Sequence, residues 1–312
     1  MDPHTLSIVI GFSILASEGF VAFLTIGFIL SIILLDFCRK KKIRTKDKIQ
    51  VFLKVSSIIF TIAVNYSEFS NALQPTTSRL SHPNPVCSVI IVFCMFSCSW
   101  LIAIQCFFYF IKIVHFRCLF IPWMRMKIGS IVSWQIVVVE LMSLVMSLLY
   151  LLTRRMAQIS STNSSYISST DMTTGEMIMN DDVLLFLLFM VGLPLVLSVI
   201  TIILTAAFLR CHMNKMKDTN TSGEVKQFNR VVHTMLRFLF LYFVFYATTF
   251  LYFFPFFAPY SVGYWINLTI VLSFVPVLYF LQILENPRWR TILLKMISCS
   301  THRRETNTLN LQ

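Results

Sequence analysis

Seven long apolar stretches constrain this 312-residue chain more than any other feature of its sequence. A membrane-spanning helix needs about 20 mostly apolar residues. Stretches of that kind predict helices at about 6–35, 49–67, 86–114, 128–152, 183–209, 231–257 and 261–284. Strands of a membrane barrel would instead alternate apolar and polar residues in short segments. With 56% hydrophobic and only 13% charged residues, the chain lacks the surface of a soluble protein. We therefore expect an all-α membrane protein, a single seven-transmembrane-helix bundle over residues 1–312.

The distribution of basic residues predicts the orientation of this bundle. Of the 26 Lys and Arg residues, seven follow the first stretch, four lie at or beyond the end of the third, six lie between the fifth and the beginning of the sixth, including its first turns, and five follow the seventh. The loops on the opposite side hold three, and Lys54 lies inside the second stretch, where its long side chain can extend to the inner headgroups. Since basic residues concentrate on the cytoplasmic side of spans, the N-terminus is predicted outside and the tail inside.

The formal net charge of +12 thus belongs to the predicted inner face. Basic residues beside spans attract anionic lipids of the bilayer, and they also suit an intracellular protein partner. They lie in juxtamembrane loops and not on a folded domain, so nucleic acid is not a predicted partner. Residues 286–299 alternate basic and apolar positions at helical spacing, which is typical of a short amphipathic helix along the inner leaflet.

The sequence offers little basis for catalysis or for a cofactor. It contains no HExxH, Walker or GxSxG pattern, and its six histidines are scattered. The ionisable residues well inside the predicted spans are Glu18, Lys54 and Glu140. Proton-coupled carriers usually need paired groups at mid-depth, so we interpret Glu140 as a polar contact between helices. We expect neither an enzyme nor a protein with a bound cofactor or metal.

The second outer loop, roughly 153–182, carries the pattern Asn163-Ser164-Ser165 in a Ser/Thr-rich stretch. This pattern is an acceptor for N-glycosylation, and an exposed outer loop is where that modification occurs. Asn163 is therefore the predicted glycosylation site. The loop contains no cysteine, so Cys87, which lies near the outer surface, has no outer partner for a disulfide.

The third predicted helix and its inner loop resemble a known family. The stretch from Trp100 to Phe116 is similar to the W-L-A-T-x-L-x-x-F-Y-F-L-K-I-A-x-F sequence of bitter taste receptors, the type 2 taste receptor family. Residues 119–128 resemble that family's F-L-W-L-K-x-R-I, and residues 209–217 resemble its S-L-x-x-H-x-x-x-M-x. Residues 286–290 stand where the family has N-x-K-L-K. The motifs occur in the family's order along most of the chain.

The chain differs from the typical sequence of this family at several positions, so it resembles a divergent member of the family. The family's helix-one Asn would fall at Ile26 and its helix-two Arg at Ser57. Its helix-seven His-Ser pair would fall near Leu278 and Tyr279, and a Trp that often lines the ligand pocket corresponds to about Ile91. These positions are expected to affect activation contacts and ligand choice.

The resemblance implies a G-protein-coupled receptor in the plasma membrane. Such a receptor would bind bitter-type small molecules from outside and promote nucleotide exchange on a gustducin-like heterotrimeric G protein. A vomeronasal-type pheromone receptor and a small membrane carrier or channel subunit remain as alternatives. Assembly into homo- or hetero-oligomers is left open.

The same resemblance implies where the ligand and the G protein bind. The ligand cavity would lie between the outer halves of helices three, five, six and seven, with the lining residues Ile91, Met95, Tyr246, Phe250, Tyr264 and Asn267. Such a cavity is mostly apolar and has no acidic residue from helix three, so it should not require a cationic ligand. The predicted coupling residues are Lys112, Arg125, Lys127, Arg210, His212 and Lys215. Most of the seven charges of the first inner loop are interpreted as lipid anchors.

Overall fold

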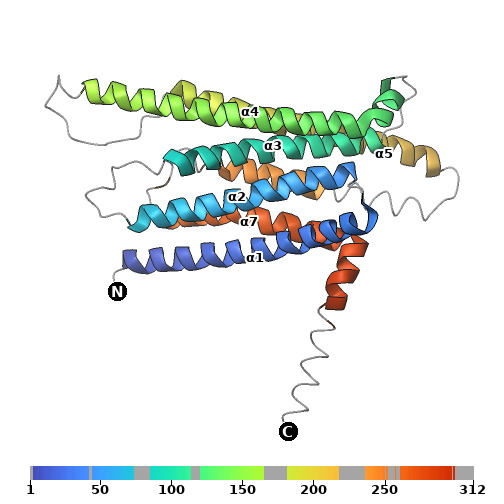
Figure 1. The fold of residues 1–312 in the computed structure, drawn as a ribbon, viewed down its shortest axis with the longest axis horizontal. Coiled ribbons are helices and arrows are strands. Elements are labelled where there is room, and N and C mark those ends of the chain that lie inside the picture. The colour runs from blue at the N-terminus through green and yellow to red at the C-terminus, as the bar shows by residue number, and fades with distance from the viewer. Residues whose placement is uncertain are drawn as a thin grey trace, which may run out of the picture.

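The computed structural model describes residues 3–41, 44–73, 85–113, 120–164, 181–217, 236–249, 251, 257, 261–296 and 298. All regular structure within these ranges is helical. The long helices are α1 (Pro3–Lys40), α2 (Thr45–Leu73), α3 (Pro85–Ile113), α4 (Phe120–Ser164), α5 (Asp181–Lys217) and α7 (Val262–Glu285). A shorter helix covers Leu236–Thr249, and another covers 287–296. The long helices lie side by side along one axis (Figure 1).

The described helices coincide with the predicted stretches and confirm an all-helical membrane protein. Five of them are long and apolar enough to cross a bilayer: Ile8–Arg39, Thr45–Asn71, Pro85–Lys112, Met126–Thr153 and Val262–Glu285. Gly192–Phe208, which is the apolar middle part of α5, and the Leu236–Thr249 helix are shorter apolar segments within the described ranges. Most helices extend beyond the predicted ends, because the prediction counted only the apolar part, whereas a helix continues through polar residues outside the bilayer.

Helix α3 occupies the middle of the bundle. It packs against α2, α4 and α5, while α1 packs against α2 and α7. Small side chains lie at these contacts: Ser97 and Ser99 of α3 are completely buried, as is Cys94. Small residues let helix backbones approach closely, which is the usual basis of helix association in membranes. The Leu236–Thr249 helix joins α7 through Phe245, whose ring stacks on Phe274 at a centroid distance of 4.2 Å.

Large apolar side chains cover the outside of the bundle. Phe20 and Leu24 of α1 are 64% and 58% exposed, and Trp134 of α4 is 69% exposed. Exposed apolar surface of this extent is unfavourable in water, whereas in a bilayer it contacts acyl chains. The outer surface therefore matches a lipid environment.

A short junction connects α7 to the 287–296 helix. Asn286 has an extended backbone, as expected for a residue before proline, and it ends α7. Pro287 then begins the next helix, and the Asn286 side chain accepts a hydrogen bond from the Arg288 N–H at 3.1 Å. Arg288 donates two hydrogen bonds of 2.6 Å to Asp36 of α1, which raises the pKa of its guanidinium. This junction holds the helix against the end of α1.

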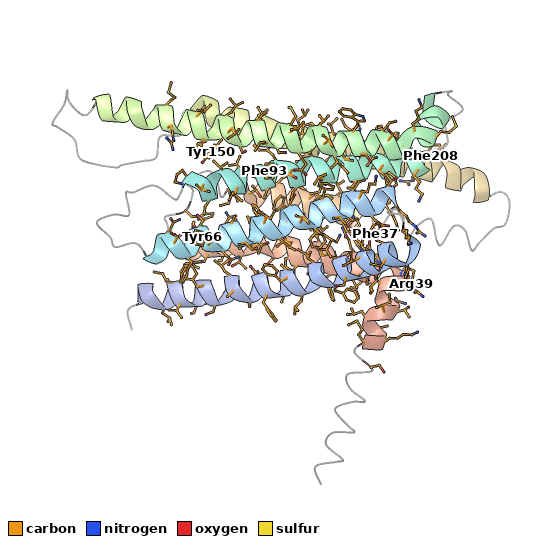
Figure 2. The ribbon with its side chains drawn as sticks, viewed as in Figure 1. Phe37, Arg39, Tyr66, Phe93, Tyr150 and Phe208 are labelled. Atoms are coloured by element: carbon orange, nitrogen blue, oxygen red, sulfur yellow. The ribbon has the colours of Figure 1, made fainter. Side chains whose placement is uncertain are left out.

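The 287–296 helix has the amphipathic character that its sequence predicts. Trp289 and Leu293 pack against the apolar core, whereas Arg290 and Lys295 are exposed. The helix lies at the end of the bundle opposite the start of α1 (Figure 1). Arg39 lies at this same end, and Tyr66 and Tyr150 lie toward the other (Figure 2).

Candidate ligand and coupling sites

The predicted ligand-binding residues that the structure describes are mostly part of the core. Ile91, Met95 and Tyr246 belong to one buried apolar cluster formed by several helices. Asn267 is buried on α7, with 5% of its surface exposed. Phe250 lies outside the described residues. The structure thus brings together an apolar wall from α3 and the Leu236–Thr249 helix, with a polar residue on α7.

Tyr264 is positioned by the first turn of α7. Ser261 caps this helix, because its hydroxyl accepts a hydrogen bond from the Tyr264 N–H at 3.2 Å. The Tyr264 hydroxyl donates to the Glu68 carboxylate of α2 at 2.6 Å. Glu68 is 2% exposed and was missed as an intramembrane acid, because the predicted second span ended at residue 67 whereas α2 continues to Leu73.

Helix α1 lies tightly against α7 beside this region. Trp265 follows Tyr264, and the centroids of their rings are 5.7 Å apart. The ring centroid of Phe12 on α1 lies 5.4 Å from that of Trp265. Gly11 faces the same indole and leaves no room for a side chain there. Further along, Ser273 of α7 donates a hydrogen bond to Glu18. Side chains of α1 therefore pack against α7 beside the predicted ligand-binding residues.

Lys54 lies inside the bundle and does not extend to the headgroups, so that prediction was wrong. Its side chain is completely buried. The ammonium donates to the side-chain oxygens of Gln50 and of Gln282, the latter at 3.4 Å, and lies 4.7 Å from the ring centroid of Tyr279. Gln50 in turn donates to Gln105 of α3 at 2.9 Å. The reason is that this face of α2 points toward α3 and α7, where amide oxygens and a ring face stabilise the cation.

Two departures from the resembled family meet in this network. Ser57 and Tyr279 share a buried hydrogen bond of 2.7 Å between α2 and α7. The Tyr279 hydroxyl also lies 3.3 Å from the carbonyl of Leu53. Lys54 precedes Ser57 by three residues and shares its helix face. Where the family has an Arg, this chain has Ser57. The cation nearby is Lys54, which lies one turn earlier on α2 and contacts the same Tyr279.

Glu140 makes the contact between helices that its position in the fourth span predicts. Ser97 of α3 donates to its carboxylate at 2.8 Å, and Ser97 lies 3.1 Å from the hydroxyl of Ser56 on α2. This confirms the interpretation of Glu140 as a structural polar group. The chain of three side chains connects α2, α3 and α4 in the middle of the bundle.

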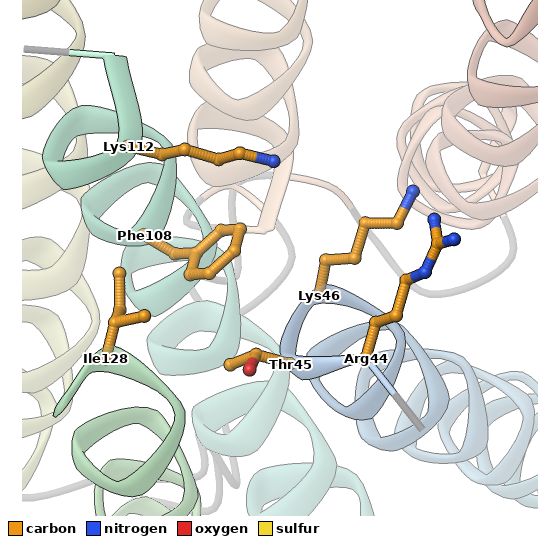
Figure 3. Close-up of a pocket in the computed structure, with 6 residues that line it drawn as sticks. All are labelled: Arg44, Thr45, Lys46, Phe108, Lys112 and Ile128. Atoms are coloured by element: carbon orange, nitrogen blue, oxygen red, sulfur yellow. The ribbon is translucent and has the colours of Figure 1, made fainter. Parts of the chain in front are cut away.

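A cavity of about 490 Å³ opens at the end of the bundle that carries the basic residues. Its lining residues are Arg44, Thr45, Lys46, Phe108, Lys112 and Ile128. Figure 3 shows Lys112 extending from the end of α3 toward the start of α2, where Lys46 and Arg44 point in one direction. The first loop was interpreted as a lipid anchor separate from the coupling face, but the fold places two of its basic residues beside Lys112.

Two of the other predicted coupling residues, Lys127 and Arg210, have described side chains, and neither lines this cavity. Lys127 lines a separate groove of about 500 Å³ between α3 and α4, together with Trp100 and Trp134. Arg210 is exposed on α5. The side chains of Arg125, His212 and Lys215 lie outside the described part, although their backbones belong to α4 and α5.

Asn163 lies in the last turn of α4, which continues past the predicted end at 152 to Ser164. Its side chain is outside the described set. Within the described ranges, no group of three His, Cys, Asp or Glu residues is arranged to hold a metal ion.

Comparison with known proteins gives two findings. Residues 1–301 match the family described as Taste receptor protein (TAS2R). The chain is also 23% identical over 292 residues to Taste receptor type 2 member 8 of Pongo pygmaeus. That alignment covers 92% of this chain and 94% of the relative.

Proposed function

The chain belongs to the TAS2R taste receptor family, and from that membership we propose that it detects bitter-type small molecules and activates a gustducin-like heterotrimeric G protein. The observation that carries this proposal is the family match over nearly the whole chain. The all-helical, lipid-compatible bundle is the architecture such a receptor requires. No catalytic step is part of the proposal, because the receptor acts by changing the population of conformations that its partner binds.

We propose that one domain spans the plasma membrane seven times, with the N-terminus outside and the tail inside. Support comes from the position of the 287–296 helix and the start of α1 at opposite ends of the bundle (Figure 1). The basic residues Arg39, Arg44 and Lys112 lie near the end that carries the 287–296 helix. This is the distribution expected for a cytoplasmic face.

The proposed agonists are apolar or neutral molecules that bind among Ile91, Met95, Tyr246, Phe250, Tyr264 and Asn267. The described members combine the apolar side chains of Ile91 and Met95 with uncharged polar groups on Tyr246, Tyr264 and Asn267, which suits such ligands. The nearby Glu68 carboxylate already accepts a hydrogen bond from Tyr264. A protonated amine is therefore not required to satisfy it.

Coupling is proposed to occur at the inner ends of α3 and α5. Lys112 is exposed, lines the basic cavity and lies within the family-like motif of the third helix. Its charge can contact an acidic group of the G protein. Arg125, Lys127, Arg210, His212 and Lys215 are proposed to extend the same interaction, which must be stronger in the active conformation than in the inactive one.

The test is agonist-dependent GTP exchange in membranes that contain the receptor and a gustducin-like heterotrimer. A panel of bitter compounds is first screened in cells carrying a chimeric G protein, and the active compounds are then used for exchange. We expect Lys112→Ala and His212→Ala to reach the surface and bind agonist while stimulated exchange falls. Lys295→Ala, a change of an exposed cation on the 287–296 helix, serves as the control. Ligand-dependent flux with no exchange would favour a carrier or channel and refute the proposal.

A further inference from the structure

The basic cavity at the end of the bundle has a composition that coupling alone does not explain. Among its described lining residues, the charged ones are Arg44, Lys46 and Lys112, and all three are cations. Lys112 belongs to α3, Lys46 lies in the first turn of α2, and Arg44 immediately precedes α2; all three line one hollow (Figure 3). Cations that face the same space repel one another, so an anion between them would be stabilised by all three.

The walls of this cavity are held by contacts of their own. Gly129 of α4 lies so close to the start of α2 that a Cβ there would be 3.3 Å from the Thr45 hydroxyl oxygen. Lys48 donates to Ser133 of α4 at 3.2 Å, so this neighbouring cation is engaged outside the cavity. The cavity also lies at the N-terminal end of α2, where the helix dipole is positive. The cavity is therefore formed by helices that pack against each other, and a ligand there would not bind to a charged loop alone.

We propose that this cavity binds the phosphate-bearing headgroup of an inner-leaflet lipid, of the class of phosphorylated phosphatidylinositols. Arg44, Lys46 and Lys112 would neutralise the phosphates, and the Thr45 hydroxyl would donate a hydrogen bond. Phe108 and Ile128 supply apolar lining for the less polar parts of the headgroup. Basic pockets between spanning helices on the cytoplasmic side are suited to such headgroups. The inference rests on the proposed topology, which places this end inside the cell.

The test measures direct binding and uses no agonist and no G protein. Full-length receptor in neutral detergent is titrated with fluorescent dioctanoyl phosphatidylinositol 4,5-bisphosphate. Arg44→Gln and Lys112→Gln remove exposed cations, so the fold should tolerate them. Each is expected to weaken binding about fivefold, since one basic residue near anionic lipid contributes about 1 kcal/mol. The matched control is Lys41→Gln, an exposed cation of the same loop outside the cavity.

Three outcomes would overturn the inference. Unchanged affinity in both cavity variants would show that the lipid binds elsewhere. Equal affinity for phosphatidylserine would show general attraction to negative charge. Binding of free inositol trisphosphate as tight as that of the lipid would assign the site to a soluble phosphate. Because the titration needs no signalling, a failure here leaves the GTP-exchange test unaffected, and a failure of coupling leaves the lipid measurement valid.

Discussion

Replacing Gly11 with alanine is expected to destabilise the contact between α1 and α7. A Cβ at this position would lie 2.6 Å from Cε2 of Trp265 and closer still to two other ring atoms. The indole is 7% exposed and has Phe12 and Tyr264 against it. It therefore has little room to move away, and either the ring or α1 must shift.

The size of the effect follows from two opposing contributions. Overpacking a well-packed core costs about 1–3 kcal/mol. Alanine in a helix interior is favoured over glycine by about 1 kcal/mol. Because three ring atoms would lie within 2.6 Å of the new Cβ, the overpacking cost should lie at the upper end of its range, and the net loss should be about 2 kcal/mol. Thermal unfolding in detergent, followed with a thiol-reactive dye that labels the buried Cys94 on opening, should show a transition lower by several degrees.

A matched control is available on the same helix. A Cβ at Gly27 would have no atom within 4 Å, so Gly27→Ala should leave the transition unchanged or raise it slightly. Adding Trp265→Leu to Gly11→Ala should recover part of the loss, because the smaller side chain makes room for the methyl group. A Gly11→Ala receptor that unfolds at the wild-type temperature would refute the close packing of α1 against α7.

Three further predictions address the network, the topology and the outer loop. Ser57→Ala and Tyr279→Phe should each reduce stability, and a double-mutant cycle should give a coupling of about 0.6 kcal/mol for their hydrogen bond; fully additive effects would argue against the bond. An N-terminal epitope tag should stain intact cells and a C-terminal one only permeabilised cells, and the reverse pattern would invert the topology. Glycosidase treatment should lower the apparent mass on a gel by one glycan, and Asn163→Gln should abolish that shift. A shift that persists in this variant would assign the glycan to another Asn.

The helices could be predicted from the sequence because the signal is local. A run of apolar residues can be compared directly with the thickness of a bilayer, whatever the rest of the chain does. The junction after α7 is equally local, since Asn286 and Pro287 end one helix and begin the next through their own backbone preferences. The family-like motif from Trp100 to Phe116 is also a contiguous stretch. The match over residues 1–301 confirmed the family that this motif indicated.

The partners of the polar residues could not be predicted in this way. Lys54 and Gln282 are far apart in the chain, and so are Glu68 and Tyr264. An isolated cation in an apolar helix can extend to the headgroups or turn inward, and both outcomes agree with its sequence neighbourhood. The choice depends on which face of α2 packs against α7.

The basic cavity illustrates the same division between sequence and tertiary structure. The charges of Arg44, Lys46 and Lys112 and their place beside spans are evident from the sequence, since charged residues mark where a helix leaves the bilayer. Their position around one hollow is not, because it depends on how α3 packs against α2. Helix positions follow from local hydrophobicity, whereas a site depends on the rotation and packing of helices, which only contacts between distant residues determine.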